Sequence, residues 1–329
     1  MVDVSIIIVS WNTKDRLNDC LNSVYRQAPK LTYEIIVVDN ASGDGSSAMI
    51  KKEFPQVNLI ENTENRGFAA ANNQGIAITK GRYVLLLNSD TLILNNAIAK
   101  TVVFADNHPE VAVVGCKVLN PDGTLQRTCF MFPSLLNMLL SSTYLYKLFP
   151  RSKFFGREQM TWWDRDDVRE VDVVTGCFML VRRRAIEQIG VLDERFFMYG
   201  EETDWCYRFK QANWKIVFTS GGQIIHFGGA SSSKMAAGKT LQLRGAILQF
   251  MAKHYSKAAC ILACILAGAF FALRVPFWLT RTIFSPKNRL SCWSTVKVYS
   301  KGVFRLLHGY KGLLVKAGRQ HTSERYQKV

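Results

Sequence analysis

The sequence predicts an α/β fold, a Rossmann-like and mostly parallel sheet flanked by helices, followed by an apolar C-terminal helical segment. Three observations lead to this prediction. Short β-branched runs alternate with stretches of helical spacing, as in β-α-β units. The runs are apolar throughout, which is typical of strands buried on both faces. Residues 258–273 then form a stretch of sixteen residues without a charge.

The first predicted unit has two strands, at 4–10 and 33–39, around a helix with apolar residues at Leu17, Leu21 and Val24. A β-α-β connection returns the chain in the same direction, so this pair is expected to be parallel.

The alternation continues with a strand at 57–62, a helix at 69–79 and a strand at 83–90. In doubly wound sheets, ligands bind in the crevice at the carboxyl ends of the strands. Asp39 and Asp90 each end a predicted strand. They are therefore expected at the mouth of the same crevice.

The remaining predicted elements are one helix and four strands, at 96–107, 111–114, 171–183, 214–219 and 223–229. The stretch 135–149 is apolar but irregular, and basic and aromatic residues follow it. It either touches a membrane surface or packs on the sheet as an insertion, and the sequence leaves both readings open.

Composition bounds the function. The 329 residues are 48% hydrophobic, which excludes wholesale disorder, and the formal charge is +16. Thirteen lysines and arginines against the single acid Glu324 lie from Lys257 onward. The eight cysteines form no CxxC pair or zinc spacing, and the first residues lack a secretory signal. Reduced thiols in the cytosol are the expectation.

The uncharged run 258–273 is a marginal membrane span, because sixteen helical residues cover about 24 Å of a hydrocarbon core of about 30 Å. Extending it to Thr280 would bury Arg274 and include Pro276. A crossing, an embedded hairpin or interfacial helix, and a soluble core helix all stay open. The acid-poor tail after Arg281 favours anionic lipid on the cytoplasmic side, and no nucleic-acid-binding module is recognisable.

Asp39 and Asp44 are candidate ligands for a nucleotide. A carboxylate at the mouth of a parallel sheet is well placed to accept hydrogen bonds from a ribose or a base edge. For Asp44, a helix-capping role is an equal alternative. The turn SWNTKDR after the first strand has no glycine, so a dinucleotide fingerprint is absent.

The segment 64–75, ENRGFAAANNQG, is a candidate for close approach to a ligand. Arg66 and Gly67 precede a small-residue helix that carries Asn72, and the free N–H groups of its first turn suit an anion. A helix that packs tightly without a ligand would look similar.

NSD at 88–90 follows a strand, and Asp90 could coordinate Mg²⁺ or Mn²⁺ together with phosphate oxygens. His226 is a candidate further ligand, because imidazole suits Mn²⁺. A turn role for Asp90 and a structural role for His226 are the alternatives.

EETD at 201–204 places Glu201, Glu202 and Asp204 within four residues. Such crowding raises at least one pKa toward values useful for a general base. Capping of a helix that starts here, with Asp204 paired to Arg208 at i,i+4, is the alternative and explains part of the cluster.

Taken in order, VSIIIVSWN, VVDNASGDGS, NRGFAAANNQG, LLLNSDT, TGCFMLVRR, FFMYGEETDWCYR and IIHFGGAS resemble an inverting glycosyltransferase of family 2 with the GT-A fold. The rhamnosyltransferase-type branch is the most similar, and the resemblance covers residues 4–255. It implies a catalytic domain at 1–256 and an apolar helix plus basic membrane-associated tail at 257–329.

The resemblance also implies roles for the candidate residues. Glu202 would be the catalytic base, with Asp204 as second choice, although the family's EDxD-like motif reads EETD here. Asp90, in a DxD-like motif that reads NSD, and His226 would hold the metal. Contacts to the donor are expected from Asp39 at the nucleobase and from Asp44, Arg66, Gly67, Asn72 and Ser89, and Arg244 would face the donor or acceptor diphosphate.

The activity implied is transfer of a sugar, with L-rhamnose from dTDP-rhamnose as first expectation, to a hydroxyl of a polyprenyl-diphosphate-linked saccharide. This would belong to cell-surface polysaccharide synthesis at the cytoplasmic face of the plasma membrane and need Mg²⁺ or Mn²⁺. A nucleotidyltransferase and a non-catalytic sugar-nucleotide-binding membrane module are the alternatives.

Overall fold

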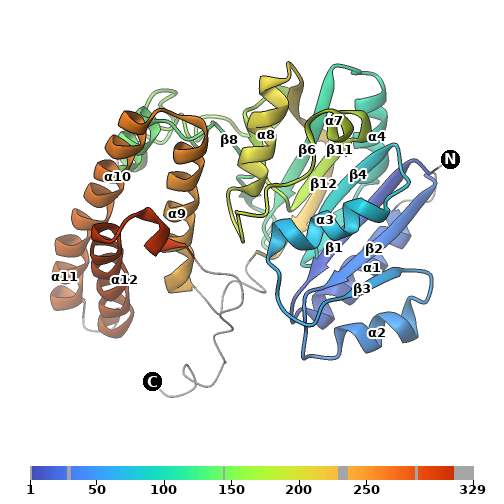
Figure 1. Cartoon of the computed structure of the whole chain (residues 1–329), viewed down its shortest axis with the longest axis horizontal. Coiled ribbons are helices and arrows are strands. Elements are labelled where there is room, and N and C mark those ends of the chain that lie inside the picture. Colours follow the sequence, from blue (N-terminus) through green and yellow to red (C-terminus); the bar gives the residue numbers. More distant parts are fainter. Residues whose placement is uncertain (1, 28–30, 144, 229–235, 286–287, 315–329) are drawn as a thin grey trace.

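The computed structural model describes residues 2–27, 31–143, 145–228, 236–285 and 288–314. Its centre is a sheet whose strands lie in the order β3-β2-β1-β4-β11-β6-β12-β5 (Figure 1). The bounds of these strands are Val4–Ser10 (β1), Tyr33–Asp39 (β2), Asn58–Glu61 (β3), Tyr83–Asn88 (β4), Thr91–Leu94 (β5), Val111–Leu119 (β6), Phe178–Arg182 (β11) and Lys215–His226 (β12).

The sheet is mixed, with a parallel block at one side. β3, β2, β1 and β4 run parallel, and β6 and β12 are parallel to each other. β11 is antiparallel to both β4 and β6, and β5 is antiparallel to β12 at the edge. Short pairings add β7 (Leu125–Gln126) to β6 and β9 (Arg169–Glu170) to β12, while β8 (Cys129–Phe130) and β10 (Val173–Val174) pair separately.

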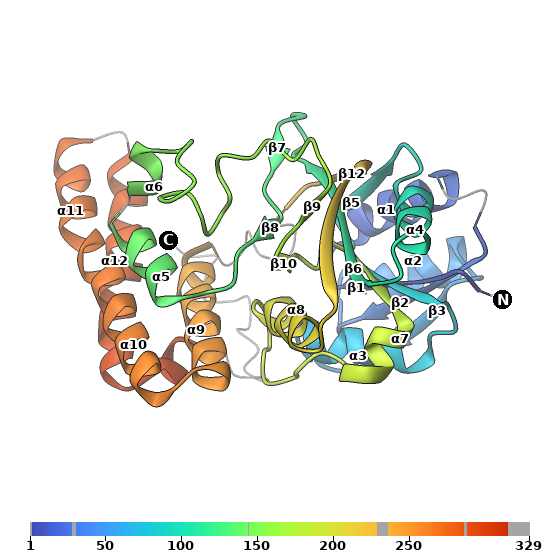
Figure 2. The ribbon, with the colours of Figure 1, turned by 90° about the horizontal axis from the view of Figure 1, so that it is seen from above.

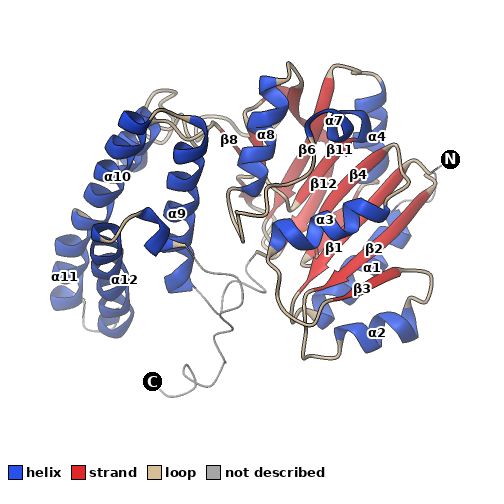
Figure 3. Cartoon of the chain, viewed as in Figure 1, coloured by secondary structure: helices blue, strands red, loops and turns tan. Residues whose placement is uncertain are grey.

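Helices cover both faces of the sheet (Figures 1 and 3). One face packs on α1 (Lys14–Gln27), α2 (Ser46–Glu53) and α4 (Ala97–Asp106), and the other on α3 (Phe68–Ile78), α7 (Arg183–Ile189) and α8 (Glu201–Gln211). The parallel strands are buried along nearly their whole length, as their continuous apolar runs predicted. Two hydrophobic cores, one on each side of the sheet, therefore hold the strand ends in fixed positions.

A second group of helices, here named the helical module, lies beside the sheet domain (Figure 2). It comprises α5 (Leu135–Ser142), α6 (Leu145–Leu148), α9 (Ala236–His254), α10 (Lys257–Ala272), α11 (Arg274–Phe284), α12 (Arg289–Leu307) and the 3₁₀ helix η3 (Tyr310–Leu313). It has its own core, to which α5, α9, α10 and η3 all contribute. α9 lies before residue 256 in the chain, yet it packs on α10 and α12, which lie after it. The predicted domain boundary at residue 256 therefore stays a prediction.

α10 and α11 follow each other with only Leu273 between them, and α12 returns alongside both. The stretch Lys257–Phe284 is long and apolar enough, by length and composition, to cross a membrane, and 28% of its most apolar window is buried. It is the one such helix in the described residues. η3 then contacts α9, so the chain returns to the base of this hairpin.

Three sequence predictions differ in detail from the structure. The strands expected at 214–219 and 223–229 form the single strand β12, with a register shift between Thr219 and Gln223. The strand expected at 171–183 is interrupted between β10 and β11. The stretch 135–149 forms α5 and α6, and α5 packs on α10 rather than on the sheet.

Candidate active site

The carboxyl ends of β1, β2 and β4 meet at one edge of the sheet. Ser10 lies opposite Asp39, and Val9 lies opposite Asn88. A chain of hydroxyl groups runs along this edge, with 3.0 Å between Ser10 Oγ and Thr13 Oγ1 and 2.9 Å between Thr13 Oγ1 and Ser89 Oγ. The parallel register thus brings polar groups from positions 10, 39 and 88 together, as expected for a ligand crevice.

Asp39 is the last residue of β2 and is buried. Its Oδ2 accepts a hydrogen bond from the backbone N–H of Ser42 at 3.0 Å, while Oδ1 has no partner among the described residues. A buried carboxylate oxygen without a donor is costly unless a ligand supplies one. Asp39 is therefore positioned to receive a hydrogen bond from a bound molecule.

Asp44 holds the first residues of two helices, although the N-cap position of α2 is taken by Gly45. Its Oδ2 accepts from the backbone N–H of Lys14 at 2.8 Å, and its Oδ1 accepts from the N–H and hydroxyl of Ser46 at 3.0 and 2.5 Å. Partial burial raises the pKa of Asp44, but the hydrogen bonds from Ser46 and Lys14 outweigh it and lower the pKa below its ordinary value. Both oxygens fix the starts of α1 and α2, and a donor contact stays a prediction.

Asn40, which the sequence analysis did not single out, organises the loop before α3. Its Nδ2 donates to Asn65 Oδ1 at 2.9 Å, and its Oδ1 accepts from the backbone N–H of Arg66 at 3.0 Å. The side chain of Arg66 is exposed. Gly67 has φ +82°, and a Cβ there would collide with the carbonyl oxygen of Phe197. The loop is thus held by backbone contacts that a larger residue would break.

Asn72 lies inside α3 and is buried, with its Nδ2 donating to the carbonyl oxygen of Phe68 at 2.9 Å. This bond serves the helix itself. The next residue, Asn73, exchanges two hydrogen bonds with the backbone of Leu192, at 2.9 and 3.1 Å. α3 is therefore clamped to the segment that leads into α8.

Asp90 and His226 are distant in the sequence but adjacent in the structure. β12 pairs with β5 so that His226 lies opposite Thr91, and the His226 Nε2 to Asp90 Oδ1 distance is 3.2 Å. Asn88 Nδ2 lies 3.1 Å from the same nitrogen. Two of the three side chains in this cluster are the predicted metal ligands.

Gln126 orients the imidazole of His226, and sequence reasoning missed it. Gln126 Oε1 lies 2.6 Å from His226 Nδ1, and Gln126 Nε2 donates to the carbonyl oxygen of His226 at 3.1 Å and to Asn120 Oδ1 at 2.8 Å. Because an amide oxygen only accepts, Nδ1 carries the proton and Nε2 presents its lone pair toward Asp90. This is how second partners commonly fix a metal-binding histidine.

These donors fit a divalent cation that is shared with a ligand. The described residues hold no cluster of three or more His, Cys, Asp or Glu side chains suited to a metal. Asp90 Oδ1 and His226 Nε2 supply one hard oxygen and one imidazole nitrogen, as Mn²⁺ or Mg²⁺ accepts when phosphate oxygens complete the coordination. The protein part of the site is therefore incomplete without a phosphorylated ligand.

α8 begins at Glu201, after Gly200 at φ +91°. Burial raises the pKa of Glu201 well above its ordinary value, and the charge of Glu202 adds to the effect. Burial also raises the pKa of Glu202, although hydrogen bonds from its own N–H, Gly176 and Glu201 oppose the shift. Oε2 of each glutamate has no partner among the described residues. The two carboxyl groups therefore titrate as an interacting pair, and burial favours their protonated forms.

Glu202 and Asp90 both lie near Cys177. The backbone N–H of Asn88 donates to the carbonyl oxygen of Cys177 at 3.2 Å, and Gly176 hydrogen-bonds to Glu202. Burial raises the pKa of the Cys177 thiol to about 12, and the charges of Asp90 and Glu202 both contribute. The acidic cluster and Asp90 are thus both neighbours of the start of β11.

Asp204 has different surroundings. It is fully buried, and its Oδ2 accepts from Arg208 Nε at 2.9 Å, the predicted i,i+4 pair. Its Oδ1 lies 2.6 Å from Lys253 Nζ and 2.7 Å from His254 Nε2, both on α9. Lys253 also pairs with Asp193 at 2.6 Å. Asp204 therefore joins α8 to the helical module.

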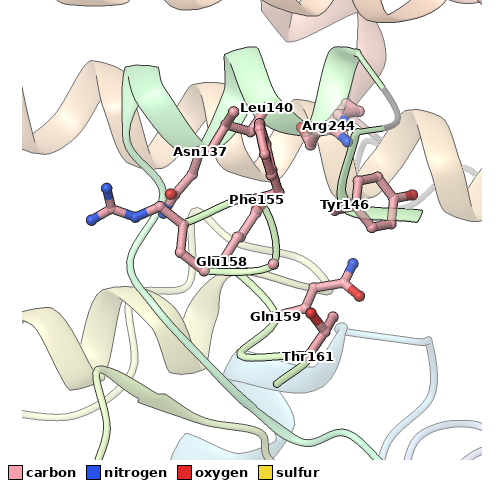
Figure 4. Close-up of a pocket in the computed structure, with 11 residues that line it drawn as sticks. Asn137, Leu140, Tyr146, Phe155, Glu158, Gln159, Thr161 and Arg244 are labelled. Carbon is pink, nitrogen blue, oxygen red and sulfur yellow. Dashed lines mark hydrogen bonds between the residues drawn. The ribbon is translucent and has the colours of Figure 1, made fainter. Parts of the chain in front are cut away.

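Arg244 lies on α9 in the helical module. Its Nη1 donates to Ser141 Oγ at 3.3 Å, and its guanidinium carbon lies 3.7 Å above the ring of Phe270. It lines a cavity of about 70 Å³ together with residues of α5 and of the segment 155–161 (Figure 4). These contacts do not include the carboxylates at the mouth of the sheet.

Chemically, this end of the sheet combines an unpartnered buried oxygen of Asp39 and a candidate cation site for phosphate oxygens, with a carboxyl group of raised pKa, Glu202, nearby. Such a set can bind a phosphorylated donor and remove a proton from a second substrate.

Comparison with known proteins agrees with this geometry. The profile of the family described as "Glycosyl transferase family 2" matches residues 5–190, more than half of the chain. N-acetylglucosaminyl-diphospho-decaprenol L-rhamnosyltransferase of Mycobacterium tuberculosis is 25% identical over 268 residues, covering 78% of this chain and 86% of that protein. The low-salt glycan biosynthesis hexosyltransferase Agl10 of Haloferax volcanii is 26% identical over 239 residues, covering 68% and 67%.

Among solved structures, a mannosyltransferase of Pyrobaculum calidifontis in complex with GDP-Man and Mn²⁺ superposes with a TM-score of 0.57. The alignment covers 94% of this chain and 87% of that one at 15% identity. A likeness at this identity concerns the fold, and it confirms the predicted GT-A class with a mostly parallel sheet flanked by helices.

Proposed function

The chain belongs to glycosyl transferase family 2, and from this premise we propose that it is an inverting, metal-dependent sugar transferase acting on a lipid-linked saccharide. The observation that supports the proposal is that Glu202 and Asp90 both lie near Cys177, whose carbonyl oxygen accepts a hydrogen bond from Asn88 at the end of β4. The relatives' names support the acceptor class, since one acts on a diphospho-decaprenol-linked sugar. The same name supports L-rhamnose as the transferred sugar, and we propose dTDP-rhamnose as its donor.

In the proposed reaction, Glu202 takes the proton of an acceptor hydroxyl as its oxygen attacks the anomeric carbon of the donor. The bond from that carbon to the diphosphate oxygen breaks on the opposite face, and a nucleoside diphosphate leaves with inverted sugar configuration in the product. The raised pKa of Glu202 suits this role, because a base near the working pH transfers protons efficiently.

Other residues of the mouth bind and orient. The free Oδ1 of Asp39 accepts a hydrogen bond from the nucleobase, as the partnerless oxygen requires. Asp90 and His226 hold Mg²⁺ or Mn²⁺, and Gln126 keeps the imidazole turned toward Asp90. When bound, the cation neutralises charge that develops on the departing diphosphate. Ser89, fixed by Thr13, lies beside Asp90 and would contact the donor.

The deciding experiment measures turnover of a panel of nucleotide sugars by the full chain with Mn²⁺ and a short-chain lipid-diphosphate saccharide. Release of a nucleoside diphosphate and an inverted anomeric coupling in the product spectrum are expected. Release of pyrophosphate would instead identify a nucleotidyltransferase. Saturable donor binding without any turnover would identify a non-catalytic module.

We also propose that the α10–α11–α12 hairpin embeds in the cytoplasmic face of the plasma membrane without crossing it. Both ends of the hairpin are tied to α9, because α10 packs on it and η3 contacts it. Large apolar side chains are exposed at its far end, at Ile283, Phe284, Leu290 and Trp293. Basic residues on α11 and α12 suit anionic headgroups.

Replacing Ile283 and Phe284 together by aspartate should abolish sedimentation of the protein with anionic vesicles. Val103→Asp, at an exposed apolar position of α4, is the matched control and should leave sedimentation unchanged. If the double variant still sediments, or if a C-terminal tag is found on the opposite side of sealed vesicles, the embedded hairpin is wrong.

A further inference from the structure

The cavity beside Arg244 lies outside the mouth of the sheet and has no role in the reaction above. Residues of α5, the segment 155–161 and α9 surround it (Figure 4). Its volume of about 70 Å³ has room for about five water molecules, or for a phosphoryl group. Its lining is mostly polar, with Asn137, Ser141, Arg157, Glu158 and Arg244 among its walls.

Two arginines and one acidic group line this cavity. Arg157 and Arg244 are the arginines, and Glu158 lies near enough to Arg244 for their charges to interact. Arg244 stacks on the ring of Phe270 at 3.7 Å, and Arg274 stacks on the same ring at 3.5 Å. Basic groups outnumber the single carboxyl group of the lining, and an anion would find two guanidinium groups here.

Two buried polar atoms of the lining have no hydrogen-bond partner among the described residues. Asn137 is buried in the first turn of α5, and its Oδ1 has no hydrogen bond among the described residues. Arg157 Nε likewise has none. Buried polar atoms in folded proteins are nearly always satisfied. Arg157 Nε is a donor and suits an anion, whereas Asn137 Oδ1 is an acceptor, because its Nδ2 donates to Phe132, and suits a water molecule or a hydroxyl group.

A second cavity, of about 430 Å³, adjoins this one. The two share Tyr146, Gln159 and Thr161 as lining residues. Arg127 and Lys147 line the second cavity, so both cavities carry basic side chains.

The outer side of the first cavity is apolar. Phe155 lines it and packs against Phe149 and Phe154, with ring centroids 5.1 and 5.3 Å apart. Both of these neighbours are exposed, as is Leu148 in α6. A ligand with phosphate groups and a hydrocarbon tail would contact the arginines and this apolar rim together.

We propose that this cavity binds the diphosphate of the lipid-linked acceptor, with the saccharide in the second cavity and the lipid on the rim formed by Leu148, Phe149 and Phe154. The proposal rests on the proposed function for the identity of the acceptor. It assigns Arg244 to the acceptor rather than to the donor, and it adds Arg157 as a binding residue. Arg157 and Arg244 would donate charge-assisted hydrogen bonds to the phosphate oxygens.

The test measures binding of farnesyl diphosphate to the full chain in detergent by calorimetry, with farnesol and inorganic pyrophosphate as the two partial ligands. Arg157→Gln and Arg244→Gln should each weaken farnesyl diphosphate binding roughly tenfold to a hundredfold. Arg151→Gln, at an exposed arginine of the same segment, is the matched control and should bind as the wild type does. Glu158→Gln should bind more tightly, because it removes a carboxylate that faces the anion.

Three outcomes would overturn the proposal: unchanged binding in both arginine variants, a rise in the donor KM rather than the acceptor KM, or equal competition by phosphatidylglycerol. The first would exclude the cavity, the second would return it to the donor, and the third would make it a general headgroup site. Binding of farnesyl diphosphate requires no turnover. If the chain binds farnesyl diphosphate through Arg157 but transfers no sugar, the proposed function is wrong and the proposed binding site is still supported.

Discussion

The two parts of the acidic cluster in α8 have opposite surroundings. Glu201 and Glu202 each keep an oxygen without a partner, and burial raises the pKa of both. Less than one turn later, Asp204 is saturated by Arg208, Lys253 and His254. Neighbouring carboxylates of one motif thus differ in their bonding: each of the first two keeps an oxygen without a partner, and the last one joins two parts of the protein.

The largest effect is expected from Glu202→Gln, which tests the reactive side of this comparison. Sugar transfer should fall about 10²–10⁴-fold, because a positioned base contributes that much, while donor binding persists. Turnover assays and donor titrations measure the two quantities. Glu187→Gln, an exposed glutamate of α7, is the control. Wild-type turnover in Glu202→Gln would show that Glu202 is not the base.

Asp204→Asn tests the structural side. It leaves Lys253 and His254 facing a neutral group, so the free energy of unfolding should fall by about 3 kcal/mol. Denaturant titration measures this loss. Asp167→Asn, which breaks the exposed pair with Arg169, should cost only about 0.5 kcal/mol. If Asp204→Asn unfolds like the wild type but loses transfer as Glu202→Gln does, the division of roles is wrong.

Gln126→Ala tests whether the candidate cation site depends on the hydrogen bond between Gln126 Oε1 and His226 Nδ1. Freed from its amide partner, the imidazole can turn or change tautomer, and the Kd for Mn²⁺ measured with bound nucleoside diphosphate should rise about 10–100-fold. Spectroscopic titration of free Mn²⁺ gives this constant. Thr124→Ala, in the adjoining turn, should leave it unchanged. An unaltered Kd in Gln126→Ala would remove Gln126 from the site.

The smallest effect concerns the pH dependence of stability. The pKa of Glu201 is raised on folding, so the folded chain binds its proton more tightly than the unfolded chain does. The resulting stabilisation is complete below the ordinary value of 4.5 and is lost as pH rises toward the raised pKa. Glu201→Gln should therefore flatten the fall in unfolding free energy above pH 4.5. A fall as steep as that of the wild type would contradict the buried, protonated Glu201.

Much of the fold could be read from the sequence, because continuous apolar runs dictate strands buried on both faces. β1 and β2 have the predicted bounds, 4–10 and 33–39. β5 was missed because its four residues, TLIL, are too short for a periodic signal. The joining of two predicted strands into β12 was missed because Gly221 and Gly222 resemble a turn, whereas they are accommodated by a register shift.

The site divides in the same way. The shared edge of Asp39 and Asp90 was predictable, since strand ends of a doubly wound sheet converge there. His226 was selected only for its imidazole, and it lies beside Asp90; the roles of all three residues stay predictions. Gln126 gave no signal, because it meets His226 across 100 residues of sequence through a two-residue strand. The cation partners of Asp204 were hidden for a related reason: Lys253 and His254 lie on a helix whose packing no local pattern reveals.

α9 carries Arg244 near its middle and Lys253 and His254 at its end, and its nineteen residues make a rod of about 28 Å. Consecutive helical residues are rotated by about 100°, so one residue inserted between Arg244 and Lys253 would turn the two contact sets away from each other. Arg244 could then no longer line its cavity while Lys253 and His254 contact Asp204 of α8. Spacing along α9 is thus as much a determinant of this enzyme as any side chain at its mouth.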